Sequence, residues 1–213
     1  MKIQWFAHAS FLLESIEGIR LITDPYDPSI GHDPIRERAD IVTVSHSHYD
    51  HANITDISGT PKVVNGAGKF EYKGVKVEGI RAFHDASAGA ERGQNIIYSI
   101  LIDTISIVHL GDLGHLLKDE QAKEIGKTDI LLIPVGGTYT LDFKAAQRVV
   151  EQIKPAIVIP MHFKTKKLVL GIDTVERFLS GKNNVLREHK SYFNIDASSI
   201  PQAQKIVVLT PAR

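Results

Sequence analysis

Short runs of strand-forming residues fill the first half of the chain, and this pattern restricts the fold more than any other feature. Most runs are apolar or alternate on a period of two, and Gly, Pro, Asn or Asp residues separate them. Asp24-Pro25 ends one run, because proline cannot donate to a sheet and restricts the residue before it. The expected strands are Lys2–Phe6, Phe11–Ser15, Ile19–Thr23, Ile41–Val44, Lys62–Asn65, Phe70–Tyr72, Val75–Phe83, Asn95–Ile102 and Thr104–His109.

The second half of the chain alternates helix and strand. The segment Asp142–Ile153 places apolar residues on one face at helical spacing, with Thr140 or Asp142 as the N-cap. A strand-rich half followed by a strand–helix half predicts an α/β protein with two sheets covered by helices, four layers in all. The other elements expected here are helices at Asp119–Gly126 and Ile172–Leu179 and strands at Asp129–Pro134, Pro155–Pro160 and Lys205–Leu209.

Composition limits the classes of function. The 213 residues favour one domain spanning 1–213. Lys and Arg total 25, as do Asp and Glu, so no chain-wide basic field for nucleic acid exists. No apolar run resembles a signal peptide or a membrane span, so we expect a cytoplasmic protein without a membrane partner. The absence of Cys removes disulfides, thiolate ligands and cysteine nucleophiles, and leaves His and carboxylate as metal ligands.

The most informative motif is His46-x-His48-x-Asp50-His51, which begins where the Ile41–Val44 strand ends. On an irregular loop these four side chains can converge, whereas a continued strand would send Asp50 and His51 to opposite faces. Neutral imidazole and carboxylate suit zinc and similar divalent ions. The motif therefore predicts a metal site, with a solvated polar turn as the alternative.

Three further residues follow strand-like runs. His84 comes after Val75–Phe83, Asp112 follows Leu110-Gly111, and His162 lies just past Ala156–Ile159. Loops at one end of the strands are where sites of such folds are assembled. We therefore expect all three to join the His46–His51 loop, although a lone His at a strand end is commonly a hydrogen-bonded surface residue.

These motifs together resemble the metallo-β-lactamase superfamily, over nearly the whole chain. The resemblance covers Ala7-His8-Ala9-Ser10, Thr23-Asp24-Pro25, the His46–His51 motif, His84, Gly111-Asp112 and Pro160-Met161-His162. It is greatest to stand-alone Zn-dependent hydrolases of the lactonase-like branch, relatives of ascorbate-6-phosphate lactonase.

The resemblance implies an αββα sandwich with two metal ions between the sheets. His46, His48 and His84 would bind one ion, and Asp50, His51 and His162 the other, with Asp112 bridging the two. Zinc suits these ligands best, and manganese, iron or nickel fit the same donors. No Cys stands at a ligand position, which makes antibiotic hydrolysis less favoured.

Such a site would carry a net charge of about +1, because two divalent ions are offset by Asp50, Asp112 and a bridging hydroxide. A positive pocket favours an anionic substrate, and metal-bound hydroxide would attack an ester, lactone, amide or phosphoester bond. We expect a metal-dependent hydrolase of a small molecule, with Asp50 and Asp112 as catalytic residues. The alternatives are a phosphodiesterase or nuclease of the same superfamily and a metal-binding protein without turnover.

Several polar residues near these motifs are expected to support ligands or substrate. Asp24 is a candidate to hydrogen-bond a ligand His, or else a turn residue that ends a strand. His8 would contact substrate or a ligand, or else be a buried His with its own partners. Arg92 and Lys164 are candidate anion clamps, or ordinary surface charges, and Tyr139 would line the mouth. His109 and His115 flank Asp112 and could compete with it as ligands, but we expect His109 to be structural and favour a position outside the pocket for His115. We expect His32 and His189 to face solvent.

Overall fold

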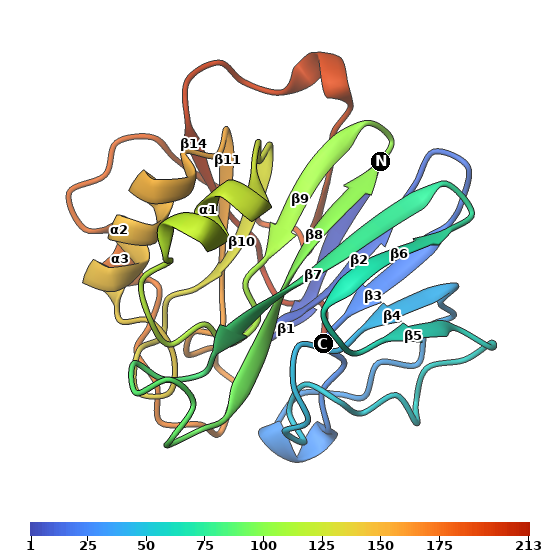
Figure 1. The fold of residues 1–213 in the computed structure, drawn as a ribbon, viewed down its shortest axis with the longest axis horizontal. Helices are drawn as coiled ribbons and strands as arrows, with labels where there is room; N and C mark the ends of the chain where they lie inside the picture. The colour runs from blue at the N-terminus through green and yellow to red at the C-terminus, as the bar shows by residue number, and fades with distance from the viewer.

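Two mixed β-sheets packed face to face form the centre of the molecule (Figure 1). The computed structural model describes residues 1–213. The six-stranded sheet has the order β13-β1-β2-β3-β4-β5, and the eight-stranded sheet has the order β12-β14-β11-β10-β9-β8-β7-β6. The first contains β1 (Lys2–Ala7), β2 (Ser10–Glu14), β3 (Arg20–Thr23), β4 (Ile41–Thr43), β5 (Lys62–Val64) and β13 (Tyr192–Asn194). The second contains β6 (Gly68–Tyr72), β7 (Val75–Phe83), β8 (Gln94–Ile102), β9 (Ile105–His109), β10 (Ile130–Pro134), β11 (Ile157–Met161), β12 (Val185–Arg187) and β14 (Lys205–Val208).

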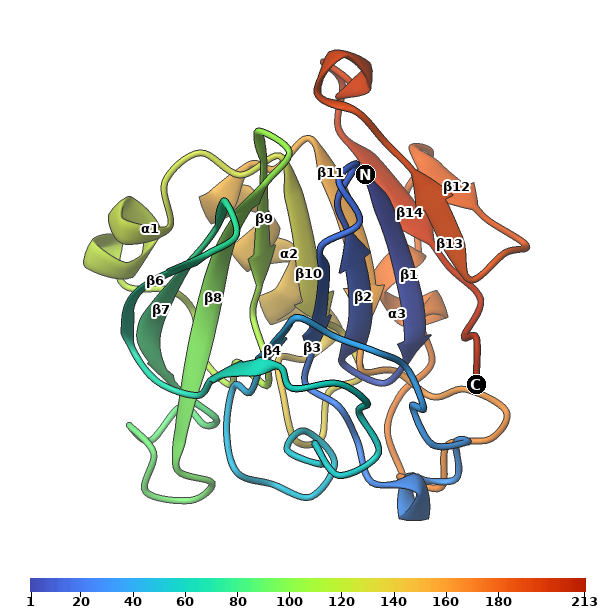
Figure 2. The same cartoon turned by 90° about the vertical axis from the view of Figure 1, so that its right-hand side faces the viewer.

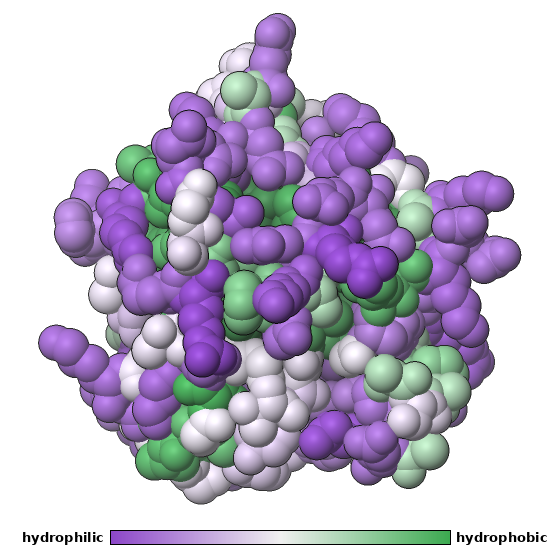
Figure 3. Space-filling model, turned by 90° about the vertical axis from the view of Figure 1, so that its left-hand side faces the viewer, coloured by the Kyte–Doolittle hydropathy of each residue, from purple (hydrophilic) through white to green (hydrophobic).

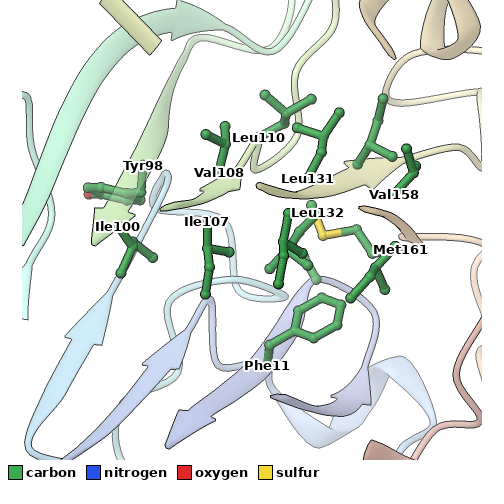
Figure 4. Close-up of a cluster of buried hydrophobic side chains, with 14 of the residues drawn as sticks. Phe11, Tyr98, Ile100, Ile107, Val108, Leu110, Leu131, Leu132, Val158 and Met161 are labelled. Carbon is green, nitrogen blue, oxygen red and sulfur yellow. The ribbon is translucent and has the colours of Figure 1, made fainter. Parts of the chain in front are cut away.

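The main hydrophobic core is a cluster of 47 buried residues that includes side chains from both sheets. Figure 4 shows Phe11 of β2 pointing toward the side chains of the eight-stranded sheet, among them Leu132 and Met161. The strands β9, β10 and β11 are parallel neighbours, and β10 and β11 are buried along their whole length. Their apolar sequences match that position, because central parallel strands are covered on both faces.

Three helices lie on the outer face of the eight-stranded sheet: α1 (Asp119–Ile125), α2 (Phe143–Ile153) and α3 (Glu176–Leu179) (Figure 1). Of the two expected N-caps of α2, Asp142 is the one observed, and its carboxylate accepts from the Ala145 amide at 2.8 Å. This side of the molecule is mainly hydrophilic, with small apolar areas between charged side chains (Figure 3). None of the helices combines the length and the apolar composition that a bilayer crossing requires.

Loops, and not helices, lie over the lower part of the outer face of the six-stranded sheet (Figure 2). Here a second cluster of 13 buried residues joins strand residues such as Leu12 and Ile22 to Ile30, Leu168 and Ile172 from the connections. Ile30 ends a short 3-10 helix, η1 (Pro28–Ile30). The predicted two-sheet α/β arrangement is therefore confirmed, with irregular chain as the layer over this sheet.

The helix expected over Ile172–Leu179 is wrong in its first half. Ile172 is buried in the second cluster, and the Asp173 amide donates to the Gly136 carbonyl at 2.8 Å. These loop contacts hold residues 172 and 173 outside a helix, and α3 begins only at Glu176. The other expected elements are present with small shifts of their ends, whereas β12 and β13 were not predicted. Each of these two has three residues, too few to show a period.

Tyr98 of β8 connects the two sheets near the start of the motif loop. Its buried hydroxyl donates to the carbonyls of Val44 at 2.8 Å and Val64 at 3.0 Å, both at the end of the six-stranded sheet's parallel strands. The hydroxyl therefore links β8 to the chain that follows β4 and to β5.

We predict that Tyr98→Phe lowers the free energy of unfolding by about 1–3 kcal/mol, because buried carbonyl groups lose a donor. Urea denaturation of native and variant protein measures the difference. Tyr192→Phe is the control, since the Tyr192 ring is 37% exposed and its hydroxyl has no hydrogen bond in the structure. Equal losses in both variants would contradict the role assigned to the Tyr98 hydroxyl.

Candidate metal centre

Loops from both sheets bring the predicted ligands to one edge of the sandwich, the lower edge in Figures 1 and 2. The loop after β4 carries the whole motif from His46 to His51. His84 follows β7 directly, Asp112 follows β9 with two residues between, and His162 follows β11 directly. All seven residues expected to bind metal therefore lie at strand ends on the same side of the molecule.

Asp112 lies at the centre of the cluster. One of its carboxylate oxygens, Oδ2, is 3.2 Å from Nε2 of His51, 3.2 Å from Nε2 of His84 and 3.3 Å from Nε2 of His162. The same oxygen is 4.0 Å from Nε2 of His46. Burial alone would raise the pKa of Asp112, but His162 and His51 outweigh it and hold that pKa well below its usual range. Asp112 is therefore a carboxylate surrounded by imidazoles.

The other potential ligands form two sets on either side of Asp112. Donor atoms of His46, His48 and His84 lie within 4.8 Å of one another, and the same is true of His8, Asp50, His51 and His162. Nε2 of His46 is 3.0 Å from Nδ1 of His48. The structure therefore brings together the residues that the resemblance assigns to each metal ion, and adds His8 to the second set.

Asp24 and Ser45 fix the orientation and tautomer of two imidazoles from behind. The buried Asp24 carboxylate accepts from Nδ1 of His51 at 2.9 Å and from the Ser45 hydroxyl at 2.5 Å. Since that hydroxyl donates to Asp24, it accepts from Nδ1 of His46 at 3.0 Å. In both rings Nδ1 is the donor to this pair, so Nε2 is the atom directed at the cluster, as metal ligation requires. Asp24 thus contacts a ligand His, one of its two expected roles.

Burial governs the protonation of His46 and His8. It is the main cause that lowers the pKa of both His46 and His8 to about 3, with neighbouring His51 and His162 adding to the effect. Both rings are therefore neutral at neutral pH. Burial also acts to lower the pKa of His51, but Asp112 and Asp24 outweigh it and raise that pKa well above the usual value. In the metal-free protein, protonated His51 therefore offsets the negative charge of Asp112 and Asp24, which a bound cation would otherwise offset.

The donor atoms fit a metal ion better than they fit each other. Two buried atoms of the proposed ligands have no hydrogen-bond partner, Nε2 of His51 and Oδ1 of Asp112. Ligands about 2.0–2.1 Å from a tetrahedral zinc ion lie about 3.3 Å apart. The spacings of 3.2–3.3 Å between Asp112 and three imidazoles match that value.

Close backbone approach holds the loops in place. Gly111 has a φ of +55°, and a Cβ atom there would collide with the side chains of Asn95 and Ser45. Asn95 accepts from the Asp112 amide at 2.9 Å and donates to the Leu110 carbonyl at 2.9 Å. Sequence reasoning missed the role of Asn95, whose only signal is an amide in an otherwise apolar strand. It fixes the backbone of the central carboxylate.

Three site residues have left-handed backbone: His8 at φ +53°, Asp24 at φ +37° and His162 at φ +50°. This conformation is uncommon for residues other than glycine and is concentrated at functional sites. The His162 amide donates to the His8 carbonyl at 3.1 Å, so two of these residues support one another across the sheets.

A cavity of about 540 Å³ opens over the cluster. His48, Asp50, His84, Asp112 and His162 form its floor and walls, and the rim includes Tyr49 and Leu170. Tyr139, predicted at the mouth, lines it together with Arg92, and the Arg92 guanidinium is 5.9 Å from the centre of the Tyr139 ring.

Two expectations about polar residues near the motifs are wrong. Lys164 does not line this cavity, because its ammonium donates to the carbonyls of Leu168 and Leu170 and so secures their loop. His32 does not face solvent: it is buried, with its ring 2.7 Å from the Arg213 carbonyl and 2.8 Å from the Thr165 hydroxyl. The sequence does not reveal these positions. Lys164 binds carbonyls of an irregular loop, and the partners of His32 are distant in the sequence.

The remaining histidines lie outside the cluster. His109 is buried, donates to the Ala9 carbonyl at 2.8 Å and accepts from the Gly111 amide at 3.1 Å, which is the structural position expected. Nε2 of His115 accepts from the Phe83 amide at 3.1 Å, and its Nδ1 donates to the Leu116 carbonyl at 2.7 Å. His115 does not line the cavity. His189 is exposed, as expected.

Comparisons with known proteins agree with this geometry. A family model described as β-lactamase superfamily domain matches residues 2–162. The crystal structure of a protein assigned as a Zn-dependent hydrolase of the metallo-β-lactamase superfamily, from Thermotoga maritima, superposes with a TM-score of 0.83 at 38% identity. The match covers 98% of this chain and 97% of that one.

Curated relatives include two metal-dependent hydrolases of the UPF0173 group. One, from Thermoplasma acidophilum, is 30% identical over 194 residues, which cover 79% of this chain and 86% of the relative. The other, from Methanosarcina barkeri, is 32% identical over 195 residues, covering 78% and 84%.

The two-sheet sandwich with a His/Asp cluster at one edge agrees with these comparisons, and the chain belongs to the metallo-β-lactamase superfamily. Within it, the chain is a metal-dependent hydrolase similar to the UPF0173 proteins. The alternative of a metal-binding protein without turnover is therefore set aside.

We predict that Asp24→Asn weakens metal binding about 10- to 100-fold, because His51 and Ser45 lose their charged acceptor. Asn tolerates the left-handed backbone at this position, so the fold should persist. Competition with a chromophoric chelator measures the affinity. Asp27→Asn is the control: it lies three residues away, and its exposed carboxylate only caps η1. Unchanged affinity in Asp24→Asn would contradict the supporting role of Asp24.

Proposed function

We propose that the protein is a binuclear zinc hydrolase that cleaves an ester, lactone or phosphoester bond of a small anionic substrate. The observation that carries the proposal is the convergence of seven side chains, from four loops of two sheets, with the Asp112 carboxylate at their centre. Bound divalent ions supply hydroxide at neutral pH, because they lower the pKa of water from 15.7 to about 7.

Two metal positions are supported by the division of the ligands. His46, His48 and His84 form one set, and Asp50, His51 and His162 form the other. Asp112 approaches His84 of the first set and both His51 and His162 of the second within 3.3 Å. A carboxylate in contact with both sets is suited to bridge two cations.

Asp50 is the ligand best placed to handle a proton. It lines the cavity, and its Oδ2 is 3.1 Å from Nε2 of His8 and 3.7 Å from Nε2 of His51. Burial alone would raise the pKa of Asp50, but His8 and His51 outweigh it and lower the pKa. Asp50 is therefore ionised at neutral pH and can accept a proton at the cavity floor, while His8 holds the carboxylate in position.

The size of the cavity supports a small substrate. A volume of about 540 Å³ falls within the range of small-molecule sites, about 300–1,000 Å³. The loaded centre would carry a charge of about +1, which favours an anion in the ground state and the oxyanion that forms during hydrolysis. With equal numbers of acidic and basic residues, the chain offers no general field for nucleic acid.

Metal analysis combined with turnover tests the proposal. Purified protein should contain about two divalent ions per chain and hydrolyse at least one of three generic substrates: a 4-nitrophenyl ester, a lactone and bis(4-nitrophenyl) phosphate. Turnover of the phosphodiester alone would favour the phosphodiesterase alternative. A single ion per fully active chain would exclude the binuclear centre.

We predict that His48→Ala and Asp112→Ala each abolish hydrolysis, because each removes a ligand that the cluster does not duplicate. The fold should persist, since the 47-residue core does not include either side chain. Turnover and circular dichroism are measured together. His189→Ala removes an exposed His away from the cluster and should keep full activity. Normal turnover by either ligand variant would refute the assignment.

A second prediction concerns pH. Activity at constant metal occupancy should rise between about pH 6 and 8, as metal-activated water ionises. His46 and His8 do not contribute to this rise, because burial lowers the pKa of each to about 3 and both stay neutral across the range. Initial rates from pH 5 to 9, with metal content checked at each pH, give the profile. A flat profile would count against ionising water as the nucleophile.

A further inference from the structure

The loop between β7 and β8 is organised by one buried carboxylate, that of Asp85, next to the ligand His84. Asp85 Oδ1 accepts from the amides of Ser87 and Gly89, both at 2.8 Å. Its Oδ2 accepts from the amides of Glu91 at 3.1 Å and Arg92 at 2.8 Å. Four backbone donors on one carboxylate fix the path of a loop that contains no helix or strand.

The ends of this loop are also joined. The His84 amide donates to the Gly93 carbonyl at 3.1 Å, and the Gly93 amide donates back to the Gly89 carbonyl at 3.0 Å. The backbone of Arg92 is therefore held relative to His84, and through it to the metal centre. These backbone hydrogen bonds therefore fix the point from which the Arg92 side chain reaches the cavity.

Arg92 is the only Lys or Arg among the residues that line the cavity. Its guanidinium packs over the Tyr139 ring at 5.9 Å, and its single acidic contact is the exposed Glu91, at 3.5 Å. Most of its five N–H donors are thus free to bind a ligand. The Tyr139 ring lies within cation–π distance of the guanidinium, whose forked donors suit two-point binding of a carboxylate or phosphate.

We propose that Arg92 binds a second anionic group of the substrate, a carboxylate or phosphate separate from the bond that is cleaved, and that Asp85 is the positioning residue that holds Arg92 there. This inference rests on the proposed function, because it requires the rest of the substrate to reach the metal centre. The exposed rings of Tyr49 and Tyr139 and the side chain of Leu170 line the same cavity, and they suit an apolar linking part of the substrate.

Binding of matched acids to the metal-loaded protein tests this without turnover. Succinate, glutarate and adipate are compared by calorimetry with the monoacids of the same chain length, butyrate, pentanoate and hexanoate. One carboxylate reaches the metal centre in every case, and only the diacids offer a second anion to Arg92. At least one diacid should bind about tenfold or more tightly than its monoacid, as expected for charge-assisted hydrogen bonds. Replacing the distal carboxylate by a phosphonate, as in 4-phosphonobutyrate, shows which anion is preferred.

Variants separate the two residues. Arg92→Gln should reduce the diacid preference to about one, and Arg92→Lys should keep part of it. Asp85→Asn should reduce the preference although Arg92 is still present, because the loop loses its charged acceptor. Arg36→Gln, which removes an exposed charge without a partner in the structure, should leave the preference unchanged. Metal content and thermal unfolding are measured for each variant, so that loss of His84 as a ligand is recognised.

The outcomes distinguish this inference from the proposed function. A diacid preference that persists in Arg92→Gln overturns the role of Arg92, as does native protein that binds diacids no better than monoacids. A preference that is lost in Arg92→Gln but intact in Asp85→Asn overturns the role of Asp85. Native protein with no bound metal would instead contradict the proposed function.

Discussion

The site exists only if two sheets pack with their strand ends at the same edge, because neither sheet holds enough ligands alone. The six-stranded sheet supplies the His46–His51 loop and His8, and the eight-stranded sheet supplies His84, Asp112 and His162. The shared core fixes the distance between these groups, so burial of apolar residues such as Phe11 also sets ligand geometry. Stability and metal binding therefore rest on the same packing.

Charge balance is the second requirement of this edge. Asp24 and Asp112 are both buried, and each is surrounded by imidazoles whose protons or metal ions offset the carboxylate charge. Burial alone would raise the pKa of Asp24, but His109, His51 and Ser45 lower it and keep it ionised. A buried carboxylate without such partners would be costly. The hydrogen bonds among Asp24, Ser45, His46 and His51 therefore stabilise the buried Asp24 carboxylate and orient the two imidazoles.

Sequence reasoning located the cluster because ligand spacing is local and strand ends are visible from apolar runs. His84, Asp112 and His162 could each be placed after a strand, and the structure brings them together. Asn95, Ser45 and Asp85 were not predicted, since their roles depend on backbone groups brought close only by the tertiary fold. The error at Lys164 has the same origin, because its carbonyl partners belong to an irregular loop.

The covering of the six-stranded sheet has a consequence for how such enzymes diverge. The segment after β11 buries Leu168 and Ile172 against that sheet and presents Leu170 to the cavity between them. Because this segment is an irregular loop, insertions and substitutions there disturb no helix. They would reshape the mouth of the cavity and leave the metal ligands in place. Changes in this loop can therefore alter which substrate binds without altering the metal-dependent reaction.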